Sequence, residues 1–533
     1  MPLQHRRKLA LVFTGAVSLG SFEAGVAYEI LKHINEGGNP GLEVDVIVGT
    51  SAGALTGALA ALCLVWGISP EIMEEAWLSV KLEDLLRLNR GDRSVLSSSK
   101  VEDLIKKYIS PPPASLIKEK APNRTVNFVA VVTNLDGIKY RIHKACGKEF
   151  SIGAIGYEDA MKFRIDRTFT DWERLRMAVR ASSAFPAALE PKTVYRSNEE
   201  FRALVRYNFS GKDQKEFHYS DGGIVNNQPL NRAIEVVNDL PETGSAGTHE
   251  RVFLVVDPSP PMGSSPRDEY GVFDVLSKAV WTIPRNQTLY KDLLLLEKVN
   301  RRIQWKNAYV SLLADIWNTC DIPPEKSRKL DSLCREVALF KGSRILEIDQ
   351  ADYLRAEEKR IRDAYKKEIN KVRDKDFFTK YCYLLEQVAD LRNKHEIAVE
   401  MITPQDADRE LAGVIFGNFG GFLDSEFMKH DFNVGRIYAG RWLKKERELN
   451  RLVLCRHQGV SPKINRRVFQ MMFDNTIPLI VEDIGPRLFA GGTEEGLGPG
   501  KLTLLGMFAV SMARYLVKKT VSMGCFLFSR GVR

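Results

Sequence analysis

The sequence predicts an α/β protein, in which a mainly parallel central sheet is covered by helices on both faces and a largely helical C-terminal region follows. Three observations predict this fold class. Short β-branched apolar runs alternate with segments of helical spacing as far as residue 256. A strand, a glycine turn and a helix follow one another twice near the N-terminus. From residue 272 to about residue 400 the apolar spacing is helical.

The length and the loop composition predict more than one domain. A chain of 533 residues is too long for one compact core, so two to three domains are expected. Pro, Gly and Ser crowd residues 258–266, and a second glycine-rich stretch occupies residues 491–500. We therefore expect an α/β domain over 1–265, a mainly helical extension over 266–490, and a connector with a basic amphipathic helix over 491–533.

The elements of the α/β part follow from apolar periodicity and from turn residues. Strands are expected at 9–13, 44–48, 126–132, 139–143, 217–220 and 252–256. Helices are expected at 21–34, 54–64, 68–88, 100–109, 172–182 and 231–239. In the extension, a single apolar stripe over 354–375 predicts an amphipathic helix that packs one face in a bundle.

The turn around Ser51 is the first candidate for a catalytic centre. The pentad Gly49-Thr50-Ser51-Ala52-Gly53 joins a buried strand to an Ala/Leu-rich helix. This is the context of a nucleophile elbow, in which the flanking glycines let strand and helix approach closely. The helix that begins beside the serine directs free N–H groups toward anything bonded to it. The pentad alone is equally typical of a small-residue turn, so other features of the chain must decide.

A second glycine turn, residues 14–20, follows the first expected strand. Backbone N–H groups in such a turn bind an anion, either a phosphate or the oxyanion of an acyl-transfer intermediate. The dinucleotide fingerprint fails because Val17 stands where its second glycine should be, and the Walker A pattern is not present. Nucleotide binding is therefore the weaker interpretation.

A serine nucleophile also needs a base. Of the eight histidines, only His218 falls near a strand end of the α/β part, and a packed or surface role suits it better. Asp221 ends an expected strand on Asp-Gly-Gly, at the sheet edge where the elbow also lies. A carboxylate takes a serine proton directly when burial raises its pKa toward the working pH. Taken alone, Asp-Gly-Gly is more often an ordinary turn.

Four sequence blocks, in this order, resemble the patatin-like phospholipases. They are TGAVSLGSFEAG (14–25), GTSAG (49–53), RASSAFPAALEP (180–191) and SDGGIVNNQPL (220–230). A fifth block, KHDFNVGRIYAGRWL (429–443), resembles a C-terminal block of some bacterial members. The resemblance covers residues 8–260, and four ordered blocks are far more specific than any one of them.

The resemblance implies a three-layer patatin-like domain and a serine–aspartate dyad without histidine. Ser51 would be the nucleophile and Asp221 the base. The backbone N–H groups of Gly15, Ala16 and Val17 would form the oxyanion hole. The implied activity is hydrolysis of fatty-acyl esters of lipids, of the phospholipase A or lysophospholipase type, with no metal ion and no cofactor.

The glycine turn departs from the commoner family pattern of three glycines, any residue, a basic residue and glycine. Ala16, Val17 and Leu19 replace two of the glycines and the basic residue. Backbone donors survive such replacements, so an oxyanion hole is still expected. The missing cation leaves headgroup binding open.

The charge distribution suits either an anionic partner or a basic face that is simply solvated. The net charge of +9 is concentrated in residues 436–533, which suits peripheral contact with an anionic membrane. Only this charge bias favours a nucleic-acid partner, and the chain has no nucleic-acid-binding motif, so we expect none.

The uncharged run within residues 501–529 is too short to span a membrane. We expect a helix there that lies among lipid headgroups, or that docks on its own domain or on a second subunit in a homo-oligomer.

The remaining features concern location and alternative functions. Seven scattered cysteines without a paired spacing favour a reducing cytoplasm, with the inner face of the membrane as a peripheral location. The basic and then apolar N-terminus is interpreted as the first strand rather than as a cleaved leader. Two alternatives stay open: a lipid acyltransferase that uses the same site, and a membrane-associated scaffold whose elbow is vestigial.

Overall fold

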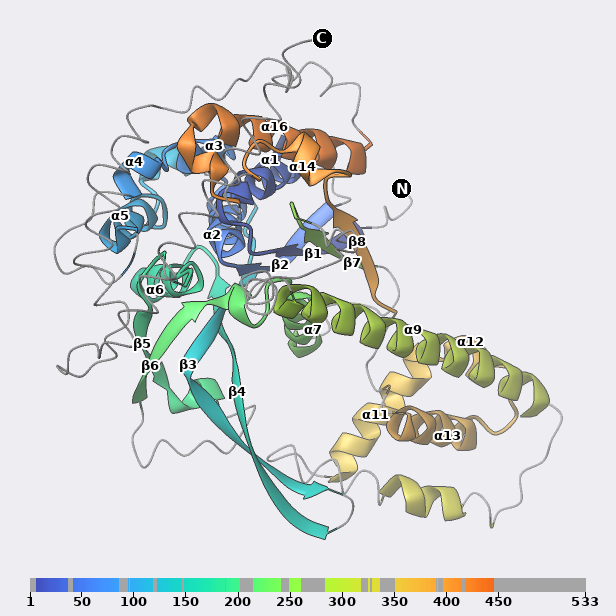
Figure 1. Ribbon diagram of the computed structural model, residues 1–533. Coiled ribbons are helices and arrows are strands. Elements are labelled where there is room, and N and C mark those ends of the chain that lie inside the picture. The colour runs from blue at the N-terminus through green and yellow to red at the C-terminus, as the bar shows by residue number, and fades with distance from the viewer. Residues whose placement is uncertain are drawn as a thin grey trace, which may run out of the picture.

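The described part of the chain forms one mixed sheet with helices on both faces and a helical arm (Figure 1). The structure is a computed structural model that describes residues 6–36, 42–85, 94, 96–117, 122–145, 148–186, 188–201, 214–240, 249–259, 283–317, 325, 328–335, 350–389, 391, 396–414 and 418–444. The connector and the basic C-terminal helix expected over 491–533 lie outside the described residues.

The centre of the sheet is parallel, as the sequence predicts. Strand β1 (Arg6–Phe13) lies between β2 (Leu42–Thr50) and β7 (His249–Val256). Beyond them, β3 (Val126–Ala145) pairs with β2, and β8 (Ala398–Ile402) pairs with β7. These strands are rich in Val, Ile and Leu because helices cover both of their faces. The predicted fold class is confirmed.

One side of the sheet is antiparallel, which the sequence did not predict. The two strands expected over 126–143 are one bent strand, β3, which forms a hairpin with β4 (Lys148–Ile165). On its other side β3 pairs with β6 (Gln214–Asp221), and β6 pairs with β5 (Lys192–Ser197). Strands β4 and β5 carry many charged residues, so they lack the apolar runs that predict buried strands.

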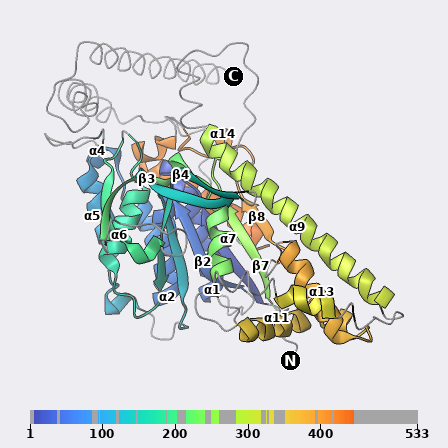
Figure 2. The ribbon, with the colours of Figure 1, turned by 90° about the horizontal axis from the view of Figure 1, so that it is seen from below.

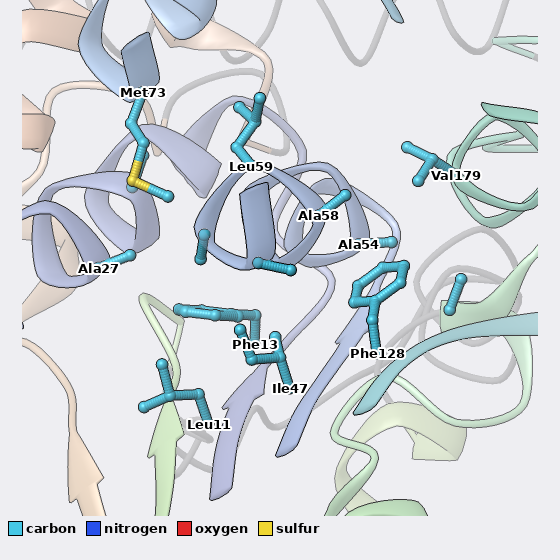
Figure 3. Close-up of a cluster of buried hydrophobic side chains, with 14 of the residues drawn as sticks. Leu11, Phe13, Ala27, Ile47, Ala54, Ala58, Leu59, Met73, Phe128 and Val179 are labelled. Atoms are coloured by element: carbon cyan, nitrogen blue, oxygen red, sulfur yellow. The ribbon is translucent and has the colours of Figure 1, made fainter. Parts of the chain in front are cut away.

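The main core lies between the sheet and the central helix α2 (Ala52–Trp66), which is buried along its length. Figure 3 shows Phe13, Ile47 and Phe128, from three neighbouring strands, beneath Ala54 and Ala58 of this helix. The other helices on this face are α1 (Gly20–Glu36), α3 (Glu71–Leu78) and α6 (Trp172–Ser182). Small residues on α2 let it lie close to the sheet, which positions the turn at its N-terminus.

The remaining helices of the α/β part are short or lie at its edges. The single helix expected over 68–88 is two helices, α3 and α4 (Leu82–Leu85). Ser79 caps the C-terminus of α3, and its hydroxyl donates to the Ala76 carbonyl oxygen at 2.7 Å. Helix α5 (Ser98–Tyr108) agrees with its expected position. Helix α7 (Leu230–Asp239) covers the opposite face of the sheet, over a second apolar cluster.

The C-terminal region is largely helical, as predicted, and has its own core. It contains α9 (Ile283–Trp317), α11 (Gln350–Ala364), α12 (Lys366–Ile369) and α13 (Lys375–Val388). Helix α9 starts beside α7 and leads away from the sheet (Figure 2). The predicted apolar stripe is buried at Ile361, Tyr365, Ile369 and Val372, although it spans two helices rather than one.

The chain then returns to the α/β body. Strand β8 joins the sheet, and α14 (Ala407–Glu410) and a 3-10 turn (Gly420–Leu423) lead into α16 (Ser425–Trp442). Helix α16 crosses α1 so closely that a Cβ added at Gly25 would lie 1.9 Å from the Phe432 carbonyl oxygen. Arg436 Nε also donates to Glu29 of α1 at 3.1 Å. The last described helix therefore packs on the first one.

Candidate active site

Ser51 occupies a strained turn between β2 and α2. Its φ of 55° and ψ of −123° are rare for a residue with a side chain, and such strain is typical of functional sites. A Cβ added at Gly49 would lie 2.3 Å from the Gly53 carbonyl oxygen, and one at Gly53 would lie 2.6 Å from the Thr14 carbonyl oxygen. The two glycines are therefore needed because strand, helix and first turn meet here.

The end of α6 holds the backbone of Ser51. Ser182 Oγ accepts from the Ser51 N–H at 2.9 Å and donates to the Val131 carbonyl oxygen of β3 at 2.6 Å. Ser183 Oγ, which also donates to Val179 O, lies 3.3 Å from the Ser51 carbonyl oxygen. Both backbone polar groups of the nucleophile candidate thus contact one pair of serines. Both serines lie in the block RASSAFPAALEP, but the sequence alone predicted no role for them.

Asp221 ends β6 and is 2% exposed. Its Oδ1 accepts from the Gly223 N–H at 2.7 Å, and Thr133 Oγ1 donates to its carbonyl oxygen at 2.8 Å. The Asp221 N–H donates to the Ala184 carbonyl oxygen at 3.0 Å. Ala184 directly follows the two serines that contact Ser51. Three consecutive residues, 182–184, therefore bond to the backbones of both candidate catalytic residues.

The strand register brings these two residues to one level of the sheet. Thr50 lies opposite Val131, and Val132 lies opposite Asp221. Because β6 is antiparallel to β3, Asp221 reaches this level of the sheet from the direction opposite to that of β2, unlike a strand of a parallel sheet. A Cβ added at Gly222 would lie 2.3 Å from Val131 O and 3.1 Å from the Thr50 methyl carbon. The turn after Asp221 thus passes over Val131, where the pairing of β3 changes from β2 to β6, and touches the residue before Ser51.

The glycine turn after β1 adjoins the same point. A Cβ added at Gly15 would lie 3.3 Å from Ser51 Cβ. The Gly15 N–H donates to Asn227 O at 3.0 Å, and Asn227 Nδ2 donates back to Gly15 O at 3.1 Å. Since the Gly15 N–H is engaged in this way, it does not serve as the expected oxyanion donor in this conformation.

Ala16 and Val17, the other two expected oxyanion donors, directly follow Gly15. They stand at the start of the 3-10 turn η1 (Val17–Leu19), where N–H groups have no acceptor within the turn. Among the described residues, no carbonyl takes these two N–H groups. Val17 has a φ of 54°, an outlier for a β-branched residue. This is the position at which the commoner family pattern has a glycine.

The segment after Asp221 links the elbow to the glycine turn. Thr50 Oγ1 donates to Asn226 O at 3.1 Å, next to the paired contacts of Asn227 with Gly15. A Cβ added at Gly223 would lie 2.7 Å from Asn227 Oδ1 and 3.0 Å from Asp221 Oδ1. Asn227, which is 5% exposed, therefore lies between the two turns. Its position in SDGGIVNNQPL was the available signal, but sequence reasoning assigned it no role.

A buried polar network lies beneath the glycine turn. Thr14 Oγ1 lies 3.3 Å from both Glu23 Oε1 and Asp257 Oδ1, and all three residues are buried. Gln228 Nε2 donates to the other oxygen of Asp257. This network connects the first residue of the turn to α1, to the end of β7 and to the segment after Asp221.

Other candidate groups lie elsewhere. The His218 ring is exposed at the surface, with Nδ1 3.2 Å from Asp136 Oδ2, in agreement with the surface role expected for it. Within the described ranges, no group of three or more His, Cys, Asp or Glu side chains is arranged to hold a metal ion. No helix in the described part of the chain is both long and apolar enough to cross a membrane.

Comparison with known proteins agrees with the resemblance deduced from the sequence. Residues 11–234 match the family model described as Patatin-like phospholipase. The chain is 26% identical over 283 residues to a Mycobacterium tuberculosis protein described as "Uncharacterized membrane protein Rv3479", covering 47% of this chain and 25% of that protein. The chain thus spans a quarter of the length of this relative.

Two solved structures align loosely with the whole chain. One is VipD from Legionella pneumophila, with 10% identity and a TM-score of 0.27, covering 97% of this chain and 86% of VipD. The other is the ExoU-SpcU complex from the type III secretion system of Pseudomonas aeruginosa, with 11% identity, a TM-score of 0.19, and coverage of 95% and 89%. TM-scores this low add nothing to the description of the fold.

Proposed function

We propose, from the premise that residues 11–234 are a patatin-like phospholipase domain, that this chain is a serine acyl hydrolase of lipids. It would act as a phospholipase A or lysophospholipase, with Ser51 as nucleophile and Asp221 as base. The observation that carries the proposal is that residues 182–184 form hydrogen bonds with the backbones of both Ser51 and Asp221. No histidine of the described residues lies in that arrangement, and the nearest candidate by sequence, His218, is at the surface.

The first half of the reaction forms an acyl-enzyme. Asp221 takes the Ser51 hydroxyl proton as the oxygen attacks the carbonyl carbon of a fatty-acyl ester. The negative charge that develops on the carbonyl oxygen is stabilised by the N–H groups of Ala16 and Val17. The C–O bond to the lipid alcohol then breaks, and Asp221 returns the proton to the leaving oxygen.

The second half regenerates the serine. A water molecule gives a proton to Asp221 and attacks the acyl carbon, and the same N–H groups stabilise the second oxyanion. The bond to Ser51 Oγ then breaks, Oγ recovers the proton, and the free fatty acid leaves. An alcohol acceptor in place of water would turn the same site into an acyltransferase.

The proposal includes peripheral contact with an anionic membrane, because the substrate is a lipid and positive charge is concentrated in residues 436–533. A cytoplasmic location at the inner membrane face fits this contact. Oligomer formation through residues 501–529 belongs to the same part of the proposal, although those residues lie outside the described ranges.

The test compares four proteins on short p-nitrophenyl esters and on mixed phospholipid vesicles. Ser51→Ala and Asp221→Asn should each reduce kcat at least about 1,000-fold, as loss of a nucleophile or its base does in other serine hydrolases. His218→Gln is the matched control and should keep wild-type activity. A fluorophosphonate probe should label the wild type but not Ser51→Ala.

Four outcomes would contradict parts of the proposal. Substantial activity of Ser51→Ala or Asp221→Asn would refute the role of that residue. Loss of activity in His218→Gln would indicate that a histidine, and not Asp221, is the base. Acyl transfer to an added lysolipid that outpaces fatty-acid release would favour the acyltransferase, and vesicle binding without any probe labelling would favour the scaffold.

A further inference from the structure

The glycine turn is also contacted by a segment about four hundred residues later in the chain, outside the family match. Ser18, which directly follows Val17, is fully buried. Its Oγ donates to the Asn418 carbonyl oxygen at 2.5 Å and accepts from the Gly421 N–H at 3.0 Å. We call the described residues 411–414 and 418–424 the loop before α16. This loop bonds to the glycine turn through the Ser18 hydroxyl, which is a donor in one hydrogen bond and an acceptor in the other.

A buried carboxylate holds that loop. Asp431 of α16 is fully buried, and its Oδ1 and Oδ2 accept from the N–H groups of Ala412 at 2.7 Å and Gly413 at 2.9 Å. Gly413 O in turn accepts from the Gly420 N–H at 3.2 Å, next to the residue that bonds Ser18. A Cβ added at Gly413 would lie 2.7 Å from Asp431 Oδ2 and 3.1 Å from Ser18 Oγ. Gly413 therefore lies close to both the Asp431 carboxylate and the Ser18 hydroxyl.

The loop is also connected to the other end of the turn. Asn418 Nδ2 donates to Ser259 Oγ at 3.2 Å, and the Ser259 N–H donates to Asp257 Oδ1 at 2.9 Å. The same Asp257 oxygen lies 3.3 Å from Thr14 Oγ1. Hydrogen bonds therefore link both residues that flank Gly15, Ala16 and Val17, namely Thr14 and Ser18, through the loop.

We propose that Asp431 is a positioning residue for the oxyanion donors, acting through the loop and Ser18. A β-branched residue with positive φ persists only where its surroundings force that conformation, and Val17 has Ser18 as its direct neighbour. If the loop were released, the turn would relax and the N–H groups of Ala16 and Val17 would rotate. This inference rests on the proposed function and extends it: the C-terminal part of the chain completes the catalytic centre.

The test measures kcat and KM separately on a short ester. Ser18→Ala removes the hydroxyl and Asp431→Asn leaves one acceptor in place of two. Each should lower kcat on the order of 10- to 100-fold with little change in KM, since displaced groups cost rate rather than ground-state binding. The double variant should be no slower than the slower single variant, because both changes release the same loop. Glu29→Gln is the control: it removes an ion pair between α1 and α16 and should keep wild-type kcat.

A second measurement does not depend on activity. Hydrogen exchange at the backbone amides of residues 15–21 should be faster in Asp431→Asn than in the wild type and unchanged in Glu29→Gln. The positioning role of Asp431 would be overturned if Ser18→Ala and Asp431→Asn both kept wild-type kcat and unchanged hydrogen exchange. That result would leave the proposed role of Ser51 as nucleophile intact. Additive losses of kcat, or equal losses in Glu29→Gln, would overturn the positioning role as well. If the wild type hydrolyses no ester, the proposed function fails and the exchange rates alone decide the positioning role. If Asp431→Asn does not fold, Ser18→Ala decides by the same two readouts.

Discussion

The two turns that meet at the candidate site are alike in strain and differ in what holds them. Ser51 and Val17 have φ values of 55° and 54°, and neither is a glycine. The Ser51 turn is held by residues 182–184, inside the stretch that matches the family model. The Val17 turn is held through Ser18 by the loop before α16, far outside that stretch.

The difference teaches how each turn is stabilised. A non-glycine residue with positive φ, such as Ser51 or Val17, costs about 1–3 kcal/mol of backbone strain, which contacts with the surrounding residues must offset. Around Ser51 the support is short, because two serines bond directly to its backbone. Around Val17 the support passes through a loop and a buried carboxylate, so more links have to hold. We therefore expect the support of the Val17 turn to depend on pH, through Asp431. The support of the Ser51 turn should change mainly when the serines beside it are substituted.

The largest expected effect is on stability as a function of pH. Burial raises the pKa of Asp431 from 3.8 to about 7, although the two N–H bonds from Ala412 and Gly413 oppose the shift. Between these pH values the folded protein binds a proton that the unfolded chain has lost. The stability that Asp431 contributes is therefore complete below about pH 4 and is lost as the pH rises through 7.

Asp431→Asn, which cannot titrate, isolates this contribution. From pH 5 to pH 8 the wild type should lose up to about 3 kcal/mol of unfolding free energy more than the variant does. Urea denaturation of both proteins at the two pH values measures the difference. A difference between the two proteins that stays constant with pH would show that Asp431 does not titrate in this range.

An intermediate effect is expected at the Ser51 turn. Ser182→Ala leaves the buried Ser51 N–H and the Val131 carbonyl without their hydroxyl partner. Leaving such groups unpaired costs about 1–3 kcal/mol, which corresponds to roughly 10- to 100-fold in kcat if the elbow relaxes. Ser183→Ala is the matched control, with a smaller expected loss, because its bond to Ser51 is longer and is shared with Val179. Equal losses in the two variants would argue that α6, and not the individual bonds, supports the elbow.

The smallest effect is expected at Val17 itself. Val17→Gly removes the steric cost of positive φ but adds flexibility to the unfolded chain, so the unfolding free energy should rise by up to about 1 kcal/mol. The N–H stays in place, so kcat should remain near that of the wild type. Ala16→Gly, at a φ of −138°, relieves no strain and should lower the unfolding free energy by about 0.5–1 kcal/mol. Thermal or urea unfolding that ranks the two variants the other way would contradict the strain at Val17.

Sequence reasoning recovered what depends on local pattern. The β-branched runs marked the parallel strands, and the buried stripe from Ile361 to Val372 marked the helical extension. It missed β4 and β5, in which charged residues interrupt any apolar run, and β8, a strand of only five residues within a stretch that was expected to be helical. It located Asp221 at the correct edge of the sheet from a strand end, although the strand runs in the opposite direction.

By itself the sequence determined where the chain has to turn sharply. Glycines at 49 and 53 are required by the close contacts of strand, turn and helix, so a sharp strand–turn–helix junction could be predicted from the pentad and its flanks. Only the tertiary structure decided what holds each turn. Hydrogen bonds such as those of Ser182 with Ser51, or of Ser18 with Gly421, join residues far apart in the chain. Periodicity and spacing report neighbours along the chain, whereas such pairs depend on how the sheet orders its strands and where α16 returns.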